Sequence, residues 1–229
     1  MKRIGILTGG GDAPGLNAVI RAAVKTAIYE YNSEVVGIRN GYDGFIEADG
    51  INPIPIETIH ILHTPGHKKL DAAKSDKPND RKIIRDGKEV MIDVSDEIIK
   101  GIKRLEMDAL LVLGGDGTLH IAHALYKKGA PIIGVPKTID NDIGGTEFTF
   151  GFDTAVNTAT EAIDKLHTTA EAHHRVMVLE LMGRDAGFIA LHAGVAGGAD
   201  VILIPEIPFK FESILAQVRQ RVQDGYLFS

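Results

Sequence analysis

The sequence predicts an α/β fold in which mostly parallel sheets are covered by helices on both faces. Short β-branched runs alternate with longer segments whose apolar residues recur every three or four positions, and this alternation is typical of βαβ units. Polar or glycine-rich turns follow several of the short runs. In such folds ligands bind beyond the carboxyl ends of the strands, so those strand exits are the places to look for chemistry.

The same periodicities assign the individual elements. Strands are expected at 3–8, 34–38, 109–113, 131–135, 176–181 and 201–204. Helices are expected at 16–31, 95–105, 118–128, 153–173 and 211–224. The last of these helices carries an apolar stripe of Phe211, Ile214, Leu215, Val218 and Val222, which predicts core packing. Residues 63–90 break the rhythm with prolines and many basic residues, and we interpret them as a lid loop or an ordinary solvated loop.

Composition excludes several classes of protein. The 229 residues, 44% of them hydrophobic, can bury one large core or two modest ones. A net charge of −6 argues against a nucleic-acid partner or a membrane surface, because both need a broad positive field. The chain has no cysteine and no apolar run approaching the roughly 18 residues of a membrane span. We therefore expect a cytoplasmic protein.

The first candidate strand exit reads TGGGDAPGLNAVIR, at residues 8–21. Three glycines before a helix start let backbone amides approach an anion closely, and the helix dipole adds a fractional positive charge. Gly10 and Gly15 have P-loop spacing but lack the following Lys and Ser/Thr, and Pro14 replaces the third glycine of the dinucleotide fingerprint. The stretch is either a phosphate cradle or a tight structural turn.

The second exit reads LGGDGT, at residues 113–118. Asp116 could hold a hard cation or could simply cap the helix, and Thr118 opens a helix whose amides can meet a phosphate. NAD kinases and lipid kinases carry similar runs. This exit therefore indicates phosphoryl transfer without naming an acceptor.

The third exit reads PKTIDND, at residues 136–142. In extended geometry Asp140 and Asp142 point to the same side with Cα atoms roughly 7 Å apart. One carboxylate could meet a metal ion that bridges phosphates while the other accepts the proton of an attacking hydroxyl. An Asp-Asn-Asp run also suits a turn held by side-chain hydrogen bonds. Three phosphate-suited exits on successive units favour phosphoryl transfer.

Six stretches together resemble the phosphofructokinase family, in matching order along nearly the whole chain. They are GGGDAPGLNAVIR, GGDGT, PKTIDND, GFDTA, HHRVMVLELMGR and AGGADVILIPE. The resemblance implies two Rossmann-like, doubly wound, mostly parallel sheet domains with the active site in the cleft between them. Residues 1–137 would bind the phosphoryl donor and residues 138–229 the sugar phosphate.

The resemblance also implies a reaction. A phosphoryl group would pass to the C1 hydroxyl of fructose 6-phosphate, giving fructose 1,6-bisphosphate, with Mg²⁺ required. Gly11 would offer its backbone amide to the transferred phosphate, and Asp116 and Asp142 would hold or orient Mg²⁺. Asp140 would be the general base.

Sugar-phosphate recognition is implied for a second group of residues. Thr138 would lie against the transferring group, and Arg184 would stabilise its charge. Met182 and Gly183 would grip the sugar phosphate, together with Arg175 from a neighbouring subunit. That last role implies a homotetramer, or a dimer.

An effector site is implied at a subunit interface of bacterial members. Arg21 and Lys25 match its basic residues, whereas His167 and Asp200 stand where arginine and glutamate are usual. These two departures argue against the usual allosteric control.

The identity of the donor depends on a few positions. The implied donor-binding residues are Gly11, Lys74, Asp116, Gly117, Thr118 and Lys137. Gly117 leaves room for a nucleotide and favours ATP, whereas Lys137 matches pyrophosphate-using relatives. Lys74 stands where the adenine-contacting region usually has an arginine, and Ile121 replaces a small residue. We favour ATP, with pyrophosphate as the alternative.

Family members also run well beyond this chain, so we expect the amino-terminal two-thirds of such an enzyme, inactive by itself. The alternative is a non-catalytic, family-derived subunit that binds phosphate ligands. A lipid or nucleotide kinase is a weaker option, because it shares only GGDGT.

Overall fold

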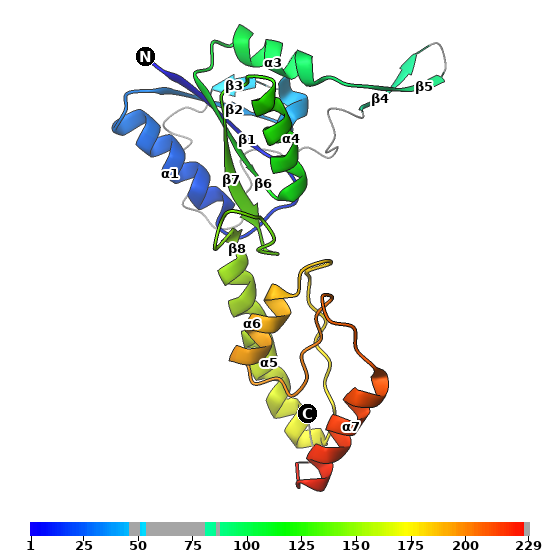
Figure 1. Ribbon diagram of the computed structural model, residues 1–229. Coiled ribbons are helices and arrows are strands. Elements are labelled where there is room, and N and C mark those ends of the chain that lie inside the picture. The colour runs from blue at the N-terminus through cyan, green and yellow to red at the C-terminus, as the bar shows by residue number, and fades with distance from the viewer. Residues whose placement is uncertain (46–50, 54–80, 86–87, 227–229) are drawn as a thin grey trace. The chain divides into compact units, whose positions relative to one another are not determined.

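The computed structural model describes residues 1–45, 51–53, 81–85 and 88–226. The chain separates into two compact units, Met1–Lys137 and Thr138–Ser229. Figure 1 identifies the elements of each unit along the chain.

The first unit is built on a mostly parallel sheet. Its strand order is β3-β2-β1-β6-β7. The bounds are β1 Arg3–Thr8, β2 Glu34–Ile38, β3 Ile51–Pro53, β6 Ala109–Gly114 and β7 Ile132–Thr138, and the short strand β8 Phe150–Gly151 belongs to the residues of the second unit. Strands β2, β1, β6 and β7 pair in parallel, and β3 is antiparallel to β2. The predicted α/β class is confirmed.

Helices cover both faces of this sheet, as Figure 1 shows. The helices are α1 Leu16–Tyr29, α3 Ser95–Arg104 and α4 Asp116–Lys127, with a short 3₁₀ helix η1 Gly41–Phe45. Ile6 packs with α1 on one face, while the next residue, Leu7, packs with α3 and α4 on the other. This is the period-two alternation of a strand buried on both faces, and it explains why β1 reads as a nearly continuous apolar run.

The structure describes part of the interruption at 63–90. β4 Arg81–Arg85 and β5 Lys88–Ile92 pair antiparallel as a separate two-stranded sheet, so the expectation of a loop is wrong for these residues. The rest of the interruption, including Lys74, lies outside the described residues.

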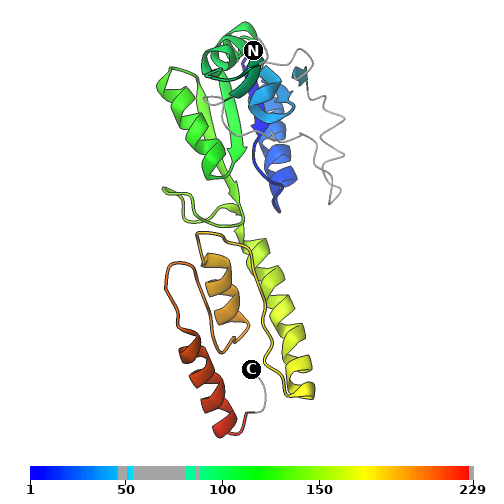
Figure 2. The ribbon, with the colours of Figure 1, turned by 90° about the vertical axis from the view of Figure 1, so that its right-hand side faces the viewer.

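The second unit consists of helices and extended chain. Its helices are α5 Phe152–His173, α6 Phe188–Ala196 and α7 Phe211–Gln223. Two views show α6 lying alongside α5 (Figures 1 and 2), where Phe152, Ala159, Ile189 and Ala193 form a small core. The sequence prediction missed α6, whose run FIALHAGVA is apolar on every side and so lacks helical periodicity.

Two other expectations are wrong in this unit. Residues 176–181 and 201–204, expected as strands, are extended but belong to no sheet in the described chain. The apolar stripe of α7 is not core either, because no residue of that helix is buried and Phe211 is 66% exposed. Within the described residues, no helix is long and apolar enough to cross a membrane.

Candidate active site

The first three glycines of the loop after β1 have different surroundings. A Cβ at Gly9 would lie 2.5 Å from the side chain of Thr118, so close packing excludes any larger residue. Gly10 has φ +70°, a left-handed conformation that glycine adopts without strain. A Cβ at Gly11 would meet nothing within 4 Å. The loop is therefore packed closely against Thr118 at Gly9 and has open space beside Gly11.

Lys137 ties this loop to the end of β7. Its side chain is buried, with only 3% exposed, and Nζ donates a hydrogen bond to the Gly11 carbonyl over 2.6 Å. The sequence places this lysine at the strand exit, whereas the structure places it inside β7 with a partner 126 residues away. A buried ammonium beside a glycine loop makes the first unit locally electropositive, as a phosphate site requires.

The second exit presents its polar groups to solvent. Gly115 is the N-cap of α4 and Asp116 is the first helical residue, so the alternative of Asp116 as the cap is wrong. Asp116 and Gly117 are exposed, and a Cβ at Gly117 would meet nothing within 4 Å. Thr118 is buried beneath them, and the Tyr42 hydroxyl donates to its carbonyl over 3.0 Å. The helix amino terminus is thus open to an anion.

The third exit, in the second unit, is held by hydrogen bonds. Asn141 adopts a left-handed conformation, φ 54°, between the two aspartates. Its Oδ1 accepts the Thr149 backbone N–H over 2.9 Å, and the Thr149 hydroxyl donates to the Thr138 carbonyl over 2.6 Å. The turn interpretation of Asp-Asn-Asp is therefore correct for the asparagine and leaves both carboxylates available. The role of Thr149 was missed because no local pattern marks it.

Asp140 has an environment suited to accepting a proton. Its Oδ1 is buried and has no hydrogen-bond partner among the described residues. Burial raises the pKa of the Asp140 carboxyl above its ordinary value, and the negative charge of Asp142 raises it further, while Arg184 and Thr138 oppose the shift. A carboxylate with a raised pKa is a stronger base.

Arg184 stands at an exposed position close enough to influence both aspartates. Its side chain is 92% exposed, and Nε donates to Asp185 Oδ2 over 2.7 Å. The hydrogen bond with Asp185 raises the pKa of Arg184, and the charges of Asp140 and Asp142 act in the same direction. The sequence prediction missed Asp185, the neighbour that holds the guanidinium in this structure.

The remaining sugar-phosphate candidates fall into two places. Met182 and Gly183 adjoin Arg184, and Gly183 has φ +120°, where a Cβ would lie only 2.4 Å from the Ala186 carbonyl oxygen. Arg175 is exposed and follows the end of α5, at the other end of the extended segment 176–181. Within the chain the structure does not bring Arg175 to residues 182–184, and its expected role from a neighbouring subunit stays a prediction.

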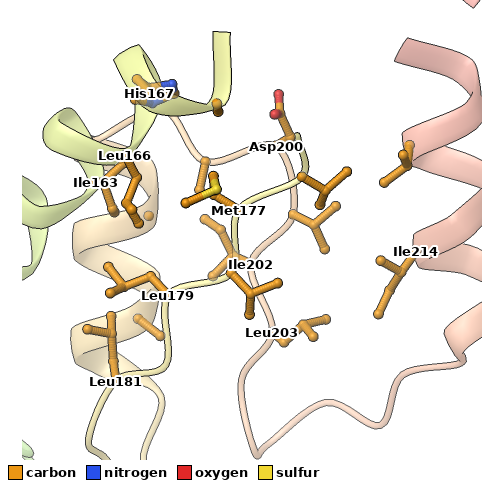
Figure 3. A pocket seen from close by; sticks show the side chains of 18 residues that line it. Ile163, Leu166, His167, Met177, Leu179, Leu181, Asp200, Ile202, Leu203 and Ile214 are labelled. Atoms are coloured by element: carbon orange, nitrogen blue, oxygen red, sulfur yellow. The ribbon is translucent and has the colours of Figure 1, made fainter. Parts of the chain in front are cut away.

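The candidate effector residues are divided between the two units. Arg21 and Lys25 lie on α1, where Lys25 Nζ sits 5.7 Å from the centre of the Tyr29 ring. In the second unit His167 Nε2 is 2.8 Å from the Gly197 carbonyl oxygen, and Asp200 pairs with Arg221 over 2.7 Å. His167 and Asp200 (Figure 3), the two residues that differ from the usual family pattern, therefore each have a polar contact within the second unit.

Comparisons with known proteins show which family the chain resembles. The phosphofructokinase family model matches residues 3–228. An ATP-dependent 6-phosphofructokinase 2 of Clostridium perfringens is 50% identical over 100% of this chain and 63% of its own length. A pyrophosphate–fructose 6-phosphate 1-phosphotransferase of Amycolatopsis methanolica is 46% identical over 98% of this chain and 62% of its own.

A solved structure is similar as well. The phosphofructokinase of Saccharomyces cerevisiae matches 99% of this chain and 33% of its own, with 31% identity and a TM-score of 0.80. The chain spans less than two thirds of the length of the curated relatives it matches.

Proposed function

The chain belongs to the phosphofructokinase family, and from that membership we propose that it carries the donor site and part of the acceptor site of a fructose 6-phosphate 1-phosphotransferase. Residues 1–137 would bind the donor and residues 138–229 the sugar phosphate. We further propose that it works in the cytoplasm as part of a homotetramer or dimer.

One observation carries the proposal. Asp140 has a buried, unpartnered carboxylate oxygen and a raised pKa, two residues from Asp142 and within the electrostatic influence of Arg184. Burial of a carboxylate oxygen without a hydrogen-bond partner costs free energy of folding, and groups of this kind cluster at functional sites. Acceptance of a proton from a hydroxyl is a function that suits this environment.

The chemistry that these residues support is as follows. The C1 hydroxyl oxygen forms a bond to the terminal phosphorus of the donor while its proton passes to Asp140, and the bond from that phosphorus to the donor's bridging oxygen breaks. Arg184 would offset the charge on the transferred group, with Thr138 beside it. The open Gly11 position would let the backbone approach the donor phosphate.

Mg²⁺ fits the residues expected to hold it. Asp116 and Asp142 are exposed carboxylates, and Mg²⁺ commonly takes one or two protein carboxylates plus phosphate oxygens and waters. A cluster of three or more possible ligands is therefore not needed, and none exists among the described residues. When bound, the ion would neutralise charge on the donor phosphates.

ATP is the favoured donor, and pyrophosphate is the alternative. The open space at Gly117 leaves room for a nucleotide beyond the transferred phosphates. Pyrophosphate is supported by Lys137, because the buried ammonium of this residue near Gly11 suits a compact, highly charged anion.

The test is a fusion of this chain to the part of the C. perfringens relative that the chain does not match. Fructose 6-phosphate phosphorylation is assayed with ATP and with pyrophosphate. We expect Mg²⁺-dependent activity with a higher kcat/KM for ATP. A kcat/KM more than about tenfold higher with pyrophosphate, roughly 1.4 kcal/mol of transition-state preference, would reverse the donor assignment. No activity with either donor would reject the proposed function.

A further inference from the structure

Thr118 packs against the first glycine of each of the first two strand exits. Its side chain is buried, with 4% exposed. A Cβ at Gly9 would lie 2.5 Å from both Cγ2 and Oγ1 of Thr118, and a Cβ at Gly114 would lie 2.4 Å from the Thr118 Cβ. Both distances are too short for real carbon atoms, so the contact with Thr118 requires glycine at these two positions.

The two exits leave the sheet side by side. Strands β1 and β6 pair in parallel as far as Thr8 and Leu113, and the Gly9 N–H donates to the Leu113 carbonyl over 2.9 Å. The first turn of α4 then packs against both exits through one side chain, that of Thr118. The distance between this turn and the glycine loop therefore depends on the size of that side chain.

The glycines of the two exits are of two kinds. Gly9 and Gly114 pack against Thr118, whereas a Cβ at Gly11 or Gly117 would meet nothing within 4 Å. Only the second kind leaves space beside the backbone for a ligand. Close packing of the first kind therefore fixes where the second kind stands.

Tyr42 anchors the backbone of the same threonine. Asn40 and Gly41 are left-handed, with φ 57° and 58°, and they turn the chain from β2 into η1. Tyr42 is then 4% exposed within the core, and its hydroxyl donates to the Thr118 carbonyl over 3.0 Å. Burial raises the pKa of Tyr42, so the phenol keeps its proton and remains a donor.

We propose that Thr118 is a positioning residue whose shape sets how closely the first turn of α4 approaches the glycine loop, and that Tyr42 holds the threonine in place. The consequence for binding rests on the proposed function, in which the open backbone groups of both exits meet the phosphates of one donor. A small displacement of one exit from the other would then weaken both sets of contacts. Direct contact of the Thr118 hydroxyl with the donor is the competing explanation.

The first test separates shape from hydrogen bonding in the fusion with the unmatched part of the C. perfringens relative. Thr118→Ala should raise KM for the donor at least about tenfold and change KM for fructose 6-phosphate less than about twofold. Thr118→Val keeps the shape without the hydroxyl, so its donor KM should rise no more than about threefold. A variant that merely unfolds more easily would lower the amount of active enzyme and leave both KM values unchanged.

The tyrosine has its own pair of variants in the same assay. Tyr42→Phe removes the hydroxyl that bonds to Thr118 and should raise the donor KM about three- to tenfold. Tyr126→Phe, 60% exposed on the same helix α4, is the matched control.

A second test changes both sides of the packing contact in the 229-residue chain. Gly9→Ala alone places a methyl group against Cγ2 and Oγ1 of Thr118 and should lower the melting temperature. Addition of Thr118→Ala removes both atoms and leaves only a Cβ 3.1 Å away, so the double variant should melt above Gly9→Ala. Gly114→Ala is the control, because its methyl group would lie 2.4 Å from the Thr118 Cβ, which Thr118→Ala retains, and no rescue is expected.

Amide hydrogen exchange in the 229-residue chain gives a readout that needs no activity. The N–H groups of Gly9 and Leu119 both bond to backbone carbonyls, of Leu113 and Gly115 respectively. Both should exchange at least about tenfold faster in Tyr42→Phe, because loss of the bond to Thr118 loosens the helix turn and the loop together. The N–H of Val19, in the first turn of α1, should be unaffected.

The outcomes that would overturn the proposal are distinct. Equal rises in donor KM for Thr118→Val and Thr118→Ala would assign the hydroxyl to the donor. An unchanged donor KM in Thr118→Ala, or no rescue of Gly9→Ala, would show that Thr118 does not set the approach of α4. Equal behaviour of Tyr42→Phe and Tyr126→Phe would exclude the tyrosine. Inactivity of the unsubstituted fusion would reject the proposed function instead, and the melting and exchange measurements would still decide whether Thr118 and Tyr42 position the two exits.

Discussion

At the residue scale, Asp140 is held in its position by backbone hydrogen bonds around it and not by a bond to its own Oδ1. Its backbone N–H donates to the Thr138 hydroxyl over 3.2 Å, whereas Oδ1 is buried without a partner in the described chain. Removal of the carboxylate should therefore alter chemistry more than local structure.

The first prediction concerns turnover. In the active fusion, Asp140→Asn should lower kcat by roughly 10²–10⁴ and leave the affinity for fructose 6-phosphate nearly unchanged, because it removes a proton acceptor and not a binding contact. Steady-state kinetics measure both quantities. Turnover within a few-fold of the parent would eliminate Asp140 as the base.

The same substitution makes a pH-dependent prediction about stability. The pKa of Asp140 is raised above its ordinary 3.8, so the folded chain holds that proton more tightly than the unfolded chain. The stabilisation that the protonated Asp140 carboxyl contributes is fully present below the ordinary pKa. It is lost as the pH rises through the pKa of Asp140 in the folded chain. Asp140→Asn, which imitates the protonated carboxyl, should therefore raise the melting temperature at pH 7 and not at pH 3.

Thermal unfolding at the two pH values checks this, with Asp164→Asn, an exposed position on α5, as the control. A gain at pH 3 that equals the gain at pH 7 would contradict the assignment of a destabilising ionised carboxylate.

Lys137 makes a third prediction. Lys137→Met keeps the length of the side chain but leaves the Gly11 carbonyl without its 2.6 Å hydrogen bond, which should cost about 1–3 kcal/mol of unfolding free energy. It should also weaken pyrophosphate binding by at least about tenfold through loss of a charge beside the loop.

Chemical denaturation and calorimetric titration measure the two effects. Lys127→Met, exposed at the end of α4, is the control. An unfolding free energy and an affinity that both match the control would show that Lys137 neither braces the loop nor attracts the donor.

At the element scale, the third exit depends on a brace between the end of β7 and the start of β8. Thr149 donates its hydroxyl proton to the Thr138 carbonyl and its N–H to Asn141, so residues 138 to 149 form one closed, hydrogen-bonded turn. The orientation of both aspartates follows from this turn, because Asn141 supplies the left-handed step between them.

The fourth prediction tests the brace. Thr149→Val keeps the shape of a buried side chain and removes the hydroxyl, which should destabilise the chain by about 1–3 kcal/mol. In the fusion it should lower kcat through misplacement of Asp140. Thr158→Val, whose exposed hydroxyl only bonds back within α5, should do neither. Equal behaviour of the two variants would refute the brace.

At the scale of the whole molecule, the second unit has far less buried apolar surface than the first. Its core is a small cluster around Phe152, while Val178 and the apolar residues of α7 are exposed to solvent. Local instability is expected where apolar contacts are few and backbone hydrogen bonds are missing.

The fifth prediction follows from this. The 229-residue chain alone should bind phosphate ligands weakly and phosphorylate fructose 6-phosphate negligibly, because the extended segment 176–181, which leads into Met182, Gly183 and Arg184, belongs to no sheet in the described chain. A coupled assay on purified chain, with contaminating kinase excluded, measures this. Robust activity of the chain alone would refute it.

Strands β1 and β2 and nearly all of α1, α3 and α5 could be predicted from sequence, because their signals are local. The spacing of apolar residues within a segment indicates which of its faces is buried, and glycine turns indicate where it ends. Both signals lie within the segment's own sequence. The three strand exits were predicted to bind phosphate from signals that are local too, namely glycines, carboxylates and a helix start at short spacing, and that assignment stays a prediction.

Other features were decided only by tertiary structure, because they depend on partners far along the chain. Lys137 Nζ bonds to the Gly11 carbonyl across the fold, and the pKa of Asp140 is raised by burial and by the charge of Asp142. Residues 176–181 have the composition of a strand, yet a strand exists only when another strand pairs with it. Local sequence determined what each segment is suited to form, and long-range contacts determined which of those structures formed and what surrounds each polar side chain.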